Sequence, residues 1–162
     1  MKAGFLNISG GAVTLLCLLI VLGARGASTM EASEAWLAEH RGSDWTGASE
    51  LWVDPSGNDG ELSDATLHIG DDGIAYTWLY RGEPQQGVLR RQAEGLLWQD
   101  SWHQPEGVLL APVRGHGSIY AAEYSYAAGE GPDWYWRIKL AERPDGSLVL
   151  QMINIAPWGE EA

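Results

Sequence analysis

The chain has 162 residues, of which 20% are charged, and a formal net charge of −12 at neutral pH. Such an excess of negative charge opposes binding to nucleic acid or to anionic lipid headgroups, so we expect neither as a partner. A single cysteine excludes an internal disulfide framework, and stability must therefore come from packing and backbone pairing.

Residues 1–26 have the pattern of a secretory signal peptide. Lys2 supplies the positive charge, Ala12–Leu22 is almost wholly apolar, and small residues precede Ala27. The apolar run is too short to span a bilayer. We therefore predict cleavage before Ala27, no stable membrane anchor, and a secreted or periplasmic protein. An uncleaved anchor, or a lipoprotein attached through Cys17, is the alternative.

The remainder, residues 27–162, is predicted to form a single domain, because no linker divides it. A short helix is expected over about residues 30–40. It follows Ser28-Thr29-Met30-Glu31, which has the form of a capping box. A helix of two to three turns must pack against a larger element to be stable.

Beyond residue 42, short apolar runs alternate with turn residues at intervals of about eight to twelve, a pattern typical of all-β proteins. A flat sheet of hairpin-linked strands leaves two open edges, and closure into a barrel removes them. We therefore predict an antiparallel up-and-down β-barrel of 8–10 strands with the helix over one end, and a β-sandwich as the alternative. The strands are expected near Trp45–Val53, Ala65–Ile69, Ile74–Tyr80, Gln86–Gln92, Leu96–Trp102, Val108–Val113, Ile119–Tyr126, Trp134–Ala141 and Leu148–Ile155.

Alternation predicts which face of the last two strands is inner. Trp134, Trp136, Ile138 and Leu140 share one face, which we expect to face the interior. The final strand is largely apolar on both faces, so it is expected to be covered on both sides.

The chain has nine Trp and six Tyr but only one Phe, and the large aromatics recur at spacings of two or four within the predicted strands. Trp and Tyr combine an apolar ring with a polar group, which suits a ring-lined ligand pocket as well as a core. The first hypothesis is therefore an exported barrel that binds a small apolar or aromatic molecule. Its expected ligand contacts are Trp78, Trp98, Asp100, Trp102, His103, Tyr124, Trp134 and Trp136.

Two alternatives remain. An enzyme on the same barrel would use Asp100 or Glu123 with His103 as acid and base. Alternation along one strand separates Asp100 from His103, which opposes a catalytic triad with Ser101 unless the strand bends. A structural ion pair, with Arg137 among the available partners, is the simpler role for these carboxylates. The third hypothesis is a protein-interaction module with a filled core and exposed aromatics.

No metal or cofactor is expected. The histidines outside the leader, His40, His68, His103 and His116, are far apart in sequence and have no cysteine to join them. The aspartates in Gly-containing loops do not match a calcium-binding loop, and turn formation explains them better.

Gly42-Ser43-Asp44-Trp45, at the start of the first strand after a short helix, resembles the opening of lipocalin and fatty-acid-binding-protein (calycin-type) barrels. Those barrels typically begin with Gly-x-Trp, and here one extra residue intervenes. The resemblance implies that a late-strand arginine, Arg137, covers Trp45. The stretches Tyr76-Thr77-Trp78, Asp100-Ser101-Trp102-His103 and Asp133-Trp134-Tyr135-Trp136-Arg137 also resemble an exported bacterial family of unknown function, which implies no activity.

Overall fold

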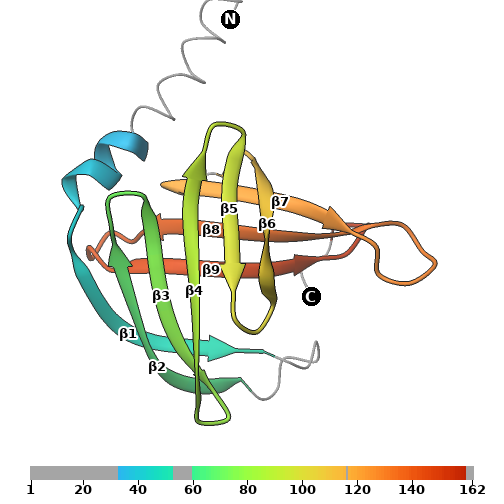
Figure 1. Ribbon diagram of the computed structural model, residues 1–162, viewed down its shortest axis with the longest axis horizontal. Coiled ribbons are helices and arrows are strands. Elements are labelled where there is room, and N and C mark those ends of the chain that lie inside the picture. Colours follow the sequence, from blue (N-terminus) through green and yellow to red (C-terminus); the bar gives the residue numbers. More distant parts are fainter. Residues whose placement is uncertain (1–32, 53–59, 116, 160–162) are drawn as a thin grey trace, which may run out of the picture.

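A computed structural model describes residues 33–52, 60–115 and 117–159. The predicted signal peptide, the capping box at 28–31, most of the loop at 55–60 and His116 lie outside these ranges. The described residues form one short N-terminal helix, with helical residues 33–39, followed by nine antiparallel strands. Each strand pairs with the next in chain order, and the sheet curls through 276° into a half-barrel (Figure 1).

The predicted all-β, up-and-down architecture is confirmed. Within the described ranges every expected strand is present, with ends that move by a few residues. The strands are β1 (Asp44–Leu51), β2 (Glu61–Ile69), β3 (Gly73–Tyr80), β4 (Glu83–Gln92), β5 (Gly95–Asp100), β6 (Gln104–Pro112), β7 (Tyr120–Tyr126), β8 (Trp134–Glu142) and β9 (Leu148–Ile155).

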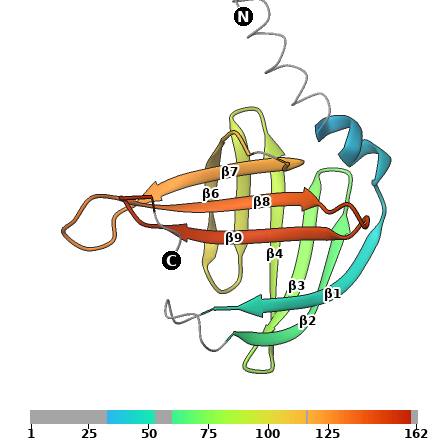
Figure 2. The ribbon, with the colours of Figure 1, turned by 180° about the vertical axis from the view of Figure 1, so that it is seen from behind.

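The shortest ladder of the sheet joins β6 and β7. It has only two residue pairs, Ala111↔Glu123 and Pro112↔Ala122, and one further backbone hydrogen bond follows, from Val113 N to Ala121 O at 3.0 Å. After β6, the strands β7, β8 and β9 run across β4, β5 and β6, behind them in Figure 1 and in front of them in Figure 2. No ladder joins β1 to β9 within the described sheet, so the two edges that a full barrel would pair remain separate.

The helix covers one end of the half-barrel, which we call the helix end. Trp36 and Leu37 pack against the core, and the Trp36 indole donates to Glu142 Oε2 at 2.7 Å. Arg91 pairs with Glu34 at 2.6 Å, which fastens the helix to β4. These contacts supply the larger partner that so short a helix requires. The described part of the chain contains no helix long and apolar enough to cross a membrane.

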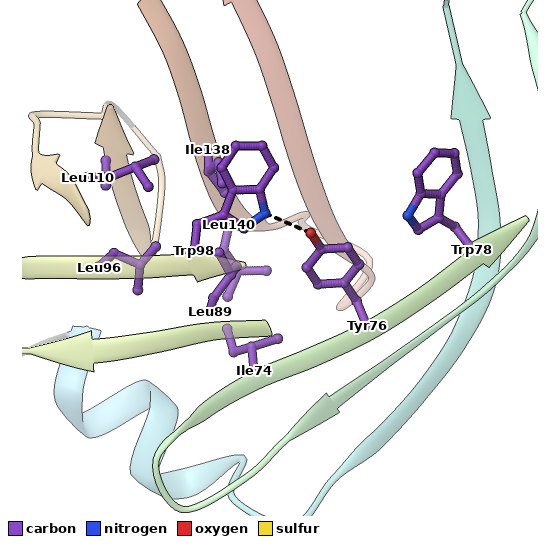
Figure 3. Close-up of a cluster of buried hydrophobic side chains, with 10 residues drawn as sticks. Ile74, Tyr76, Trp78, Leu89, Leu96, Trp98, Leu110, Ile138 and Leu140 are labelled. Atoms are coloured by element: carbon purple, nitrogen blue, oxygen red, sulfur yellow. Dashed lines mark hydrogen bonds between the residues drawn. The ribbon is translucent and has the colours of Figure 1, made fainter. Parts of the chain in front are cut away.

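The core lies between the two crossing halves of the sheet, where inward side chains from β3 to β8 meet (Figure 3). The predicted inner face of β8 is confirmed at Ile138 and Leu140, which are 1% and 2% exposed. Opposite them in the β8–β9 ladder, Met152 and Leu150 pack against the same core. Most β9 side chains on both faces are half-buried, in keeping with its apolar sequence.

Replacement of Leu110 by alanine tests this core. Leu110 is fully buried, whereas its neighbour Leu109 points outward and is 40% exposed. Leu110→Ala should lower the free energy of unfolding by about 2–5 kcal/mol, because it removes apolar burial and leaves a cavity. The control Leu109→Ala should cost less than about 1 kcal/mol. Urea unfolding measures the free energy of unfolding of both variants. Equal losses in the two variants would contradict the assignment of Leu110 to the inner face and Leu109 to the outer face.

Candidate functional site

The end of the half-barrel opposite the helix carries the β3–β4, β5–β6 and β7–β8 connections, and we call it the aromatic end. Here β5 stops at Asp100, and residues 101–103 form a turn before β6 begins at Gln104. The expectation that β5 continues to Trp102, with Asp100 and His103 on opposite faces, is therefore wrong. Because the chain turns, His103 Nδ1 lies 2.9 Å from Asp100 Oδ1.

The carboxylate of Asp100 is 1% exposed and fully hydrogen-bonded. Its Oδ1 accepts the backbone N–H groups of Trp102 and His103, at 3.0 and 2.9 Å, as well as contacting the His103 ring. Its Oδ2 accepts the Tyr76 hydroxyl at 2.7 Å. A side chain that binds the amides two and three residues on is a standard way to hold a turn. Asp100 therefore fixes the β5–β6 turn.

Tyr76 links this turn to the centre of the core. Its hydroxyl oxygen accepts the indole N–H of Trp98 at 2.8 Å (Figure 3), and its O–H group donates to Asp100 Oδ2. Tyr76 lies opposite Gly87 in the β3–β4 ladder, and a Cβ at Gly87 would fall 2.2 Å from the Tyr76 hydroxyl. A glycine is needed there because any larger residue would displace the tyrosine.

Burial and hydrogen bonding act in opposite directions on Asp100. Burial alone would raise the pKa of its carboxyl group, but hydrogen bonds from His103, Tyr76 and two backbone amides lower the pKa to about 2. The pKa of Tyr76 is raised by burial and by the neighbouring negative charge. At neutral pH the site therefore holds an ionised carboxylate and a neutral phenol that donates to it.

Rings surround His103. Its ring centroid lies 4.5 Å from Trp102, 5.2 Å from Trp136, and 5.8 Å from both Trp78 and Trp98. We call these rings and those joined to them the aromatic cluster; its members are Trp78, Tyr80, Trp98, Trp102, His103, Tyr124, Tyr126 and Trp136.

Two features of the aromatic cluster concern Trp136. Trp98 and Trp136 stack with centroids 5.6 Å apart and planes 7° from parallel. The Nε1 of Trp136 is buried and has no hydrogen-bond partner within the described residues. A buried donor without an acceptor costs about 1–3 kcal/mol, which is unusual in a folded protein.

The rings of the aromatic cluster pack against one another and do not enclose a large cavity. Trp98 is 1% exposed and Trp78 is 7% exposed, whereas Trp102 at the tip of the turn is 40% exposed. Two hollows of the described surface, of about 470 and 200 Å³, lie elsewhere, and no residue of the aromatic cluster lines either one. A ligand would therefore meet this site at its rim.

The structure brings together every residue of the predicted ligand site except Trp134. Trp134 instead packs edge-on against Trp158 at 5.9 Å. Tyr76 and Tyr80 were missed, although they share the strand face of Trp78, so alternation alone would have found them. Gln104, which donates to the Tyr124 hydroxyl at 2.7 Å, had no sequence signal.

Of the residues proposed for catalysis, Asp100 and His103 are in contact, whereas Glu123 is separated from both. Glu123 lies on the outer face of β7, where Arg137 donates two hydrogen bonds to its Oε2, at 3.0 and 2.8 Å. Asp100 and Glu123 therefore do not share a cleft, and the structural ion pair is the observed role of Glu123. The hydroxyl of Ser101 bonds Gln86 N and Gln85 Oε1, away from His103, so no catalytic triad forms.

The arrangement implied by the lipocalin resemblance is also absent at Arg137. Its guanidinium binds Glu123, while the Trp45 indole donates to Ser43 Oγ at 2.9 Å and its ring lies 6.1 Å from that of His40. No group of three or more His, Cys, Asp or Glu in the described ranges is arranged to hold a metal ion. No protein-family model, curated protein or solved structure matches the chain.

Acid should destabilise the protein through Asp100. Its folded pKa of about 2 lies below the ordinary 3.8, so its stabilisation is complete above about pH 5 and is lost as the pH falls towards 2. The shift corresponds to about 2 kcal/mol. Urea unfolding across this pH range measures the free energy of unfolding. In Asp100→Asn this free energy should fall less steeply with decreasing pH than in the wild type. In the control Asp64→Asn it should fall as steeply as in the wild type. An unchanged slope in Asp100→Asn would refute this assignment.

Tyr76→Phe should remove an acceptor from Trp98 and a donor from Asp100 in one step. Both partners would remain buried, so we expect a loss of about 3 kcal/mol in the free energy of unfolding. Tyr135→Phe is the matched control, since Tyr135 is 39% exposed, and it should change the free energy of unfolding by less than about 0.5 kcal/mol. Thermal and urea unfolding compare the two, and a negligible cost at Tyr76 would show that the hydroxyl is dispensable.

Proposed function

We propose that the protein is exported and binds a small planar, aromatic or otherwise apolar molecule at the rim of the aromatic cluster. One observation carries the proposal: Trp102 is 40% exposed, yet it is held edge-on to Trp78 at 5.4 Å and against Tyr80 at 4.6 Å. Export is supported by the signal-peptide pattern at residues 1–26.

Trp102 is positioned before any ligand arrives. Its backbone N–H and that of His103 are bound by the buried Asp100 carboxylate. Neighbouring rings restrict its side chain further. Pre-organisation lowers the entropy lost on binding, so a shallow aromatic surface can bind a ligand that it would otherwise hold weakly.

The negative charge of the protein favours some ligand charges over others. The site contains an ionised carboxylate, and the whole chain carries a net charge of −12. Neutral or cationic molecules are therefore favoured over anionic ones. A cation would gain further from the ring of Trp102, which is the exposed member of the aromatic cluster.

Intrinsic tryptophan fluorescence provides the test. Titration with Nile red, indole, palmitate and a naphthylammonium salt should give a saturable change with at least one neutral or cationic probe. Trp102→Ala should raise the Kd about 3- to 10-fold, the loss expected for one aromatic contact. The control is Trp158→Ala, because Trp158 is 68% exposed and lies outside the aromatic cluster. No saturable binding, or equal losses in both variants, would refute the site.

A protein-interaction module is the second candidate, and the filled interior favours it. Trp98 is almost completely buried, while Trp52, Leu62 and Trp158 are each more than half exposed. Apolar surface of this kind commonly contacts another protein. The absence of small-molecule binding in the titration would support this candidate.

A further inference from the structure

The ladder between β2 and β3 ends before either strand does. Backbone pairing runs from Ile69↔Ile74 to Thr66↔Thr77, and no pair is formed beyond it in the described residues. Yet β2 begins at Glu61 and β3 continues to Tyr80. On its other side β2 pairs with β1 along its length, from His68 to Glu61. The sheet is therefore opened between β2 and β3 near the aromatic end.

Side chains of β2 occupy the opening. The amide of Leu79 donates to Ser63 Oγ at 3.1 Å, and the amide of Arg81 donates to Glu61 Oε1 at 2.6 Å. In a continuous antiparallel ladder, β3 amides would bind carbonyl oxygens of β2. Here a side chain bridges each gap, which satisfies the amides while the two backbones stand apart.

The hollow of about 470 Å³ lies at this opening. Ala48, Leu62 and Leu79 supply apolar lining, and Leu62 is 71% exposed. Glu61 and Asp64 supply carboxylates, and no lysine or arginine is among the described residues that line it. In the adjoining turn the Arg81 guanidinium lies over the Tyr80 ring, 5.1 Å from its centroid.

We propose that this hollow docks an extended segment of a partner protein that carries apolar and basic side chains on the same face, so that they alternate at every second residue. An extended segment matches a surface made by strands, where side chains repeat with a period of two. Its apolar side chains would cover Leu62 and Leu79, and its basic side chains would pair with Glu61 and Asp64. The negative charge of the whole chain favours the approach of such a partner.

The surface is separate from the aromatic cluster. Leu79 lies between Trp78 and Tyr80 in sequence but faces the opposite side of β3, as alternation requires. None of the residues that line the hollow belongs to the aromatic cluster. The docking proposal therefore does not depend on the proposed ligand site, and each can fail independently.

The probe is the fluorescein-labelled octapeptide Lys-Ser-Val-Ser-Lys-Ser-Val-Ser, which presents Lys and Val on one face when extended; it is titrated with the full chain and followed by fluorescence anisotropy. It should bind saturably, whereas the octapeptide with Glu in place of Lys should not. The double variant Glu61→Gln/Asp64→Asn should weaken binding about 3- to 10-fold, since two exposed ion pairs are lost. Gln keeps an acceptor for the Arg81 amide, so the fold should be retained, as circular dichroism would verify.

Asp71→Asn/Asp72→Asn is the matched control, because it removes the same charge from exposed residues at the helix end. It should change the Kd less than about twofold. Leu62→Ser should weaken binding without a change of charge, and Trp102→Ala should leave it unchanged. Equal binding of the two octapeptides, or an equal effect of the two double variants, would overturn the proposal.

Discussion

The hydrogen-bonded carboxylate of Asp100 organises the aromatic end. A buried charge is tolerated only if its oxygens are fully paired, and here two amides, an imidazole and a phenol pair them. The same bonds stop β5, turn the chain and direct His103 among the tryptophan rings. Through Tyr76 and the Trp98 indole, the network continues into the apolar core.

This network explains why tryptophan and tyrosine, rather than leucine, fill the aromatic end. Trp98 and Tyr76 pack as apolar rings, yet their N–H and O–H groups form the chain that reaches Asp100. Leucine would pack equally well but would leave the carboxylate without its phenol donor. The abundance of aromatics thus has a structural cause, and the proposed recognition role falls to the exposed rim around Trp102.

The strand pattern and the inner face of β8 were predictable, because alternation and turn residues act over a few neighbouring positions. The interaction partners of outward-facing residues could not be predicted from the sequence. Arg137 was expected over Trp45 but binds Glu123, its direct neighbour across the β7–β8 ladder. Trp134 shares a strand face with Trp136, yet it packs against Trp158 at the start of β8 and is not part of the core. Such partners depend on strand register, which local sequence does not encode.

The sequence by itself determined the strand order, the acidic surface and the residues able to form an aromatic site, since these follow from composition and local periodicity. Only the tertiary structure decided that β5 ends at Asp100, that the sheet curls without a β1–β9 ladder in its described part, and that β2 and β3 separate near the aromatic end. Each of these depends on contacts between residues far apart in the chain, where packing and hydrogen bonding outweigh the alternation of any single strand.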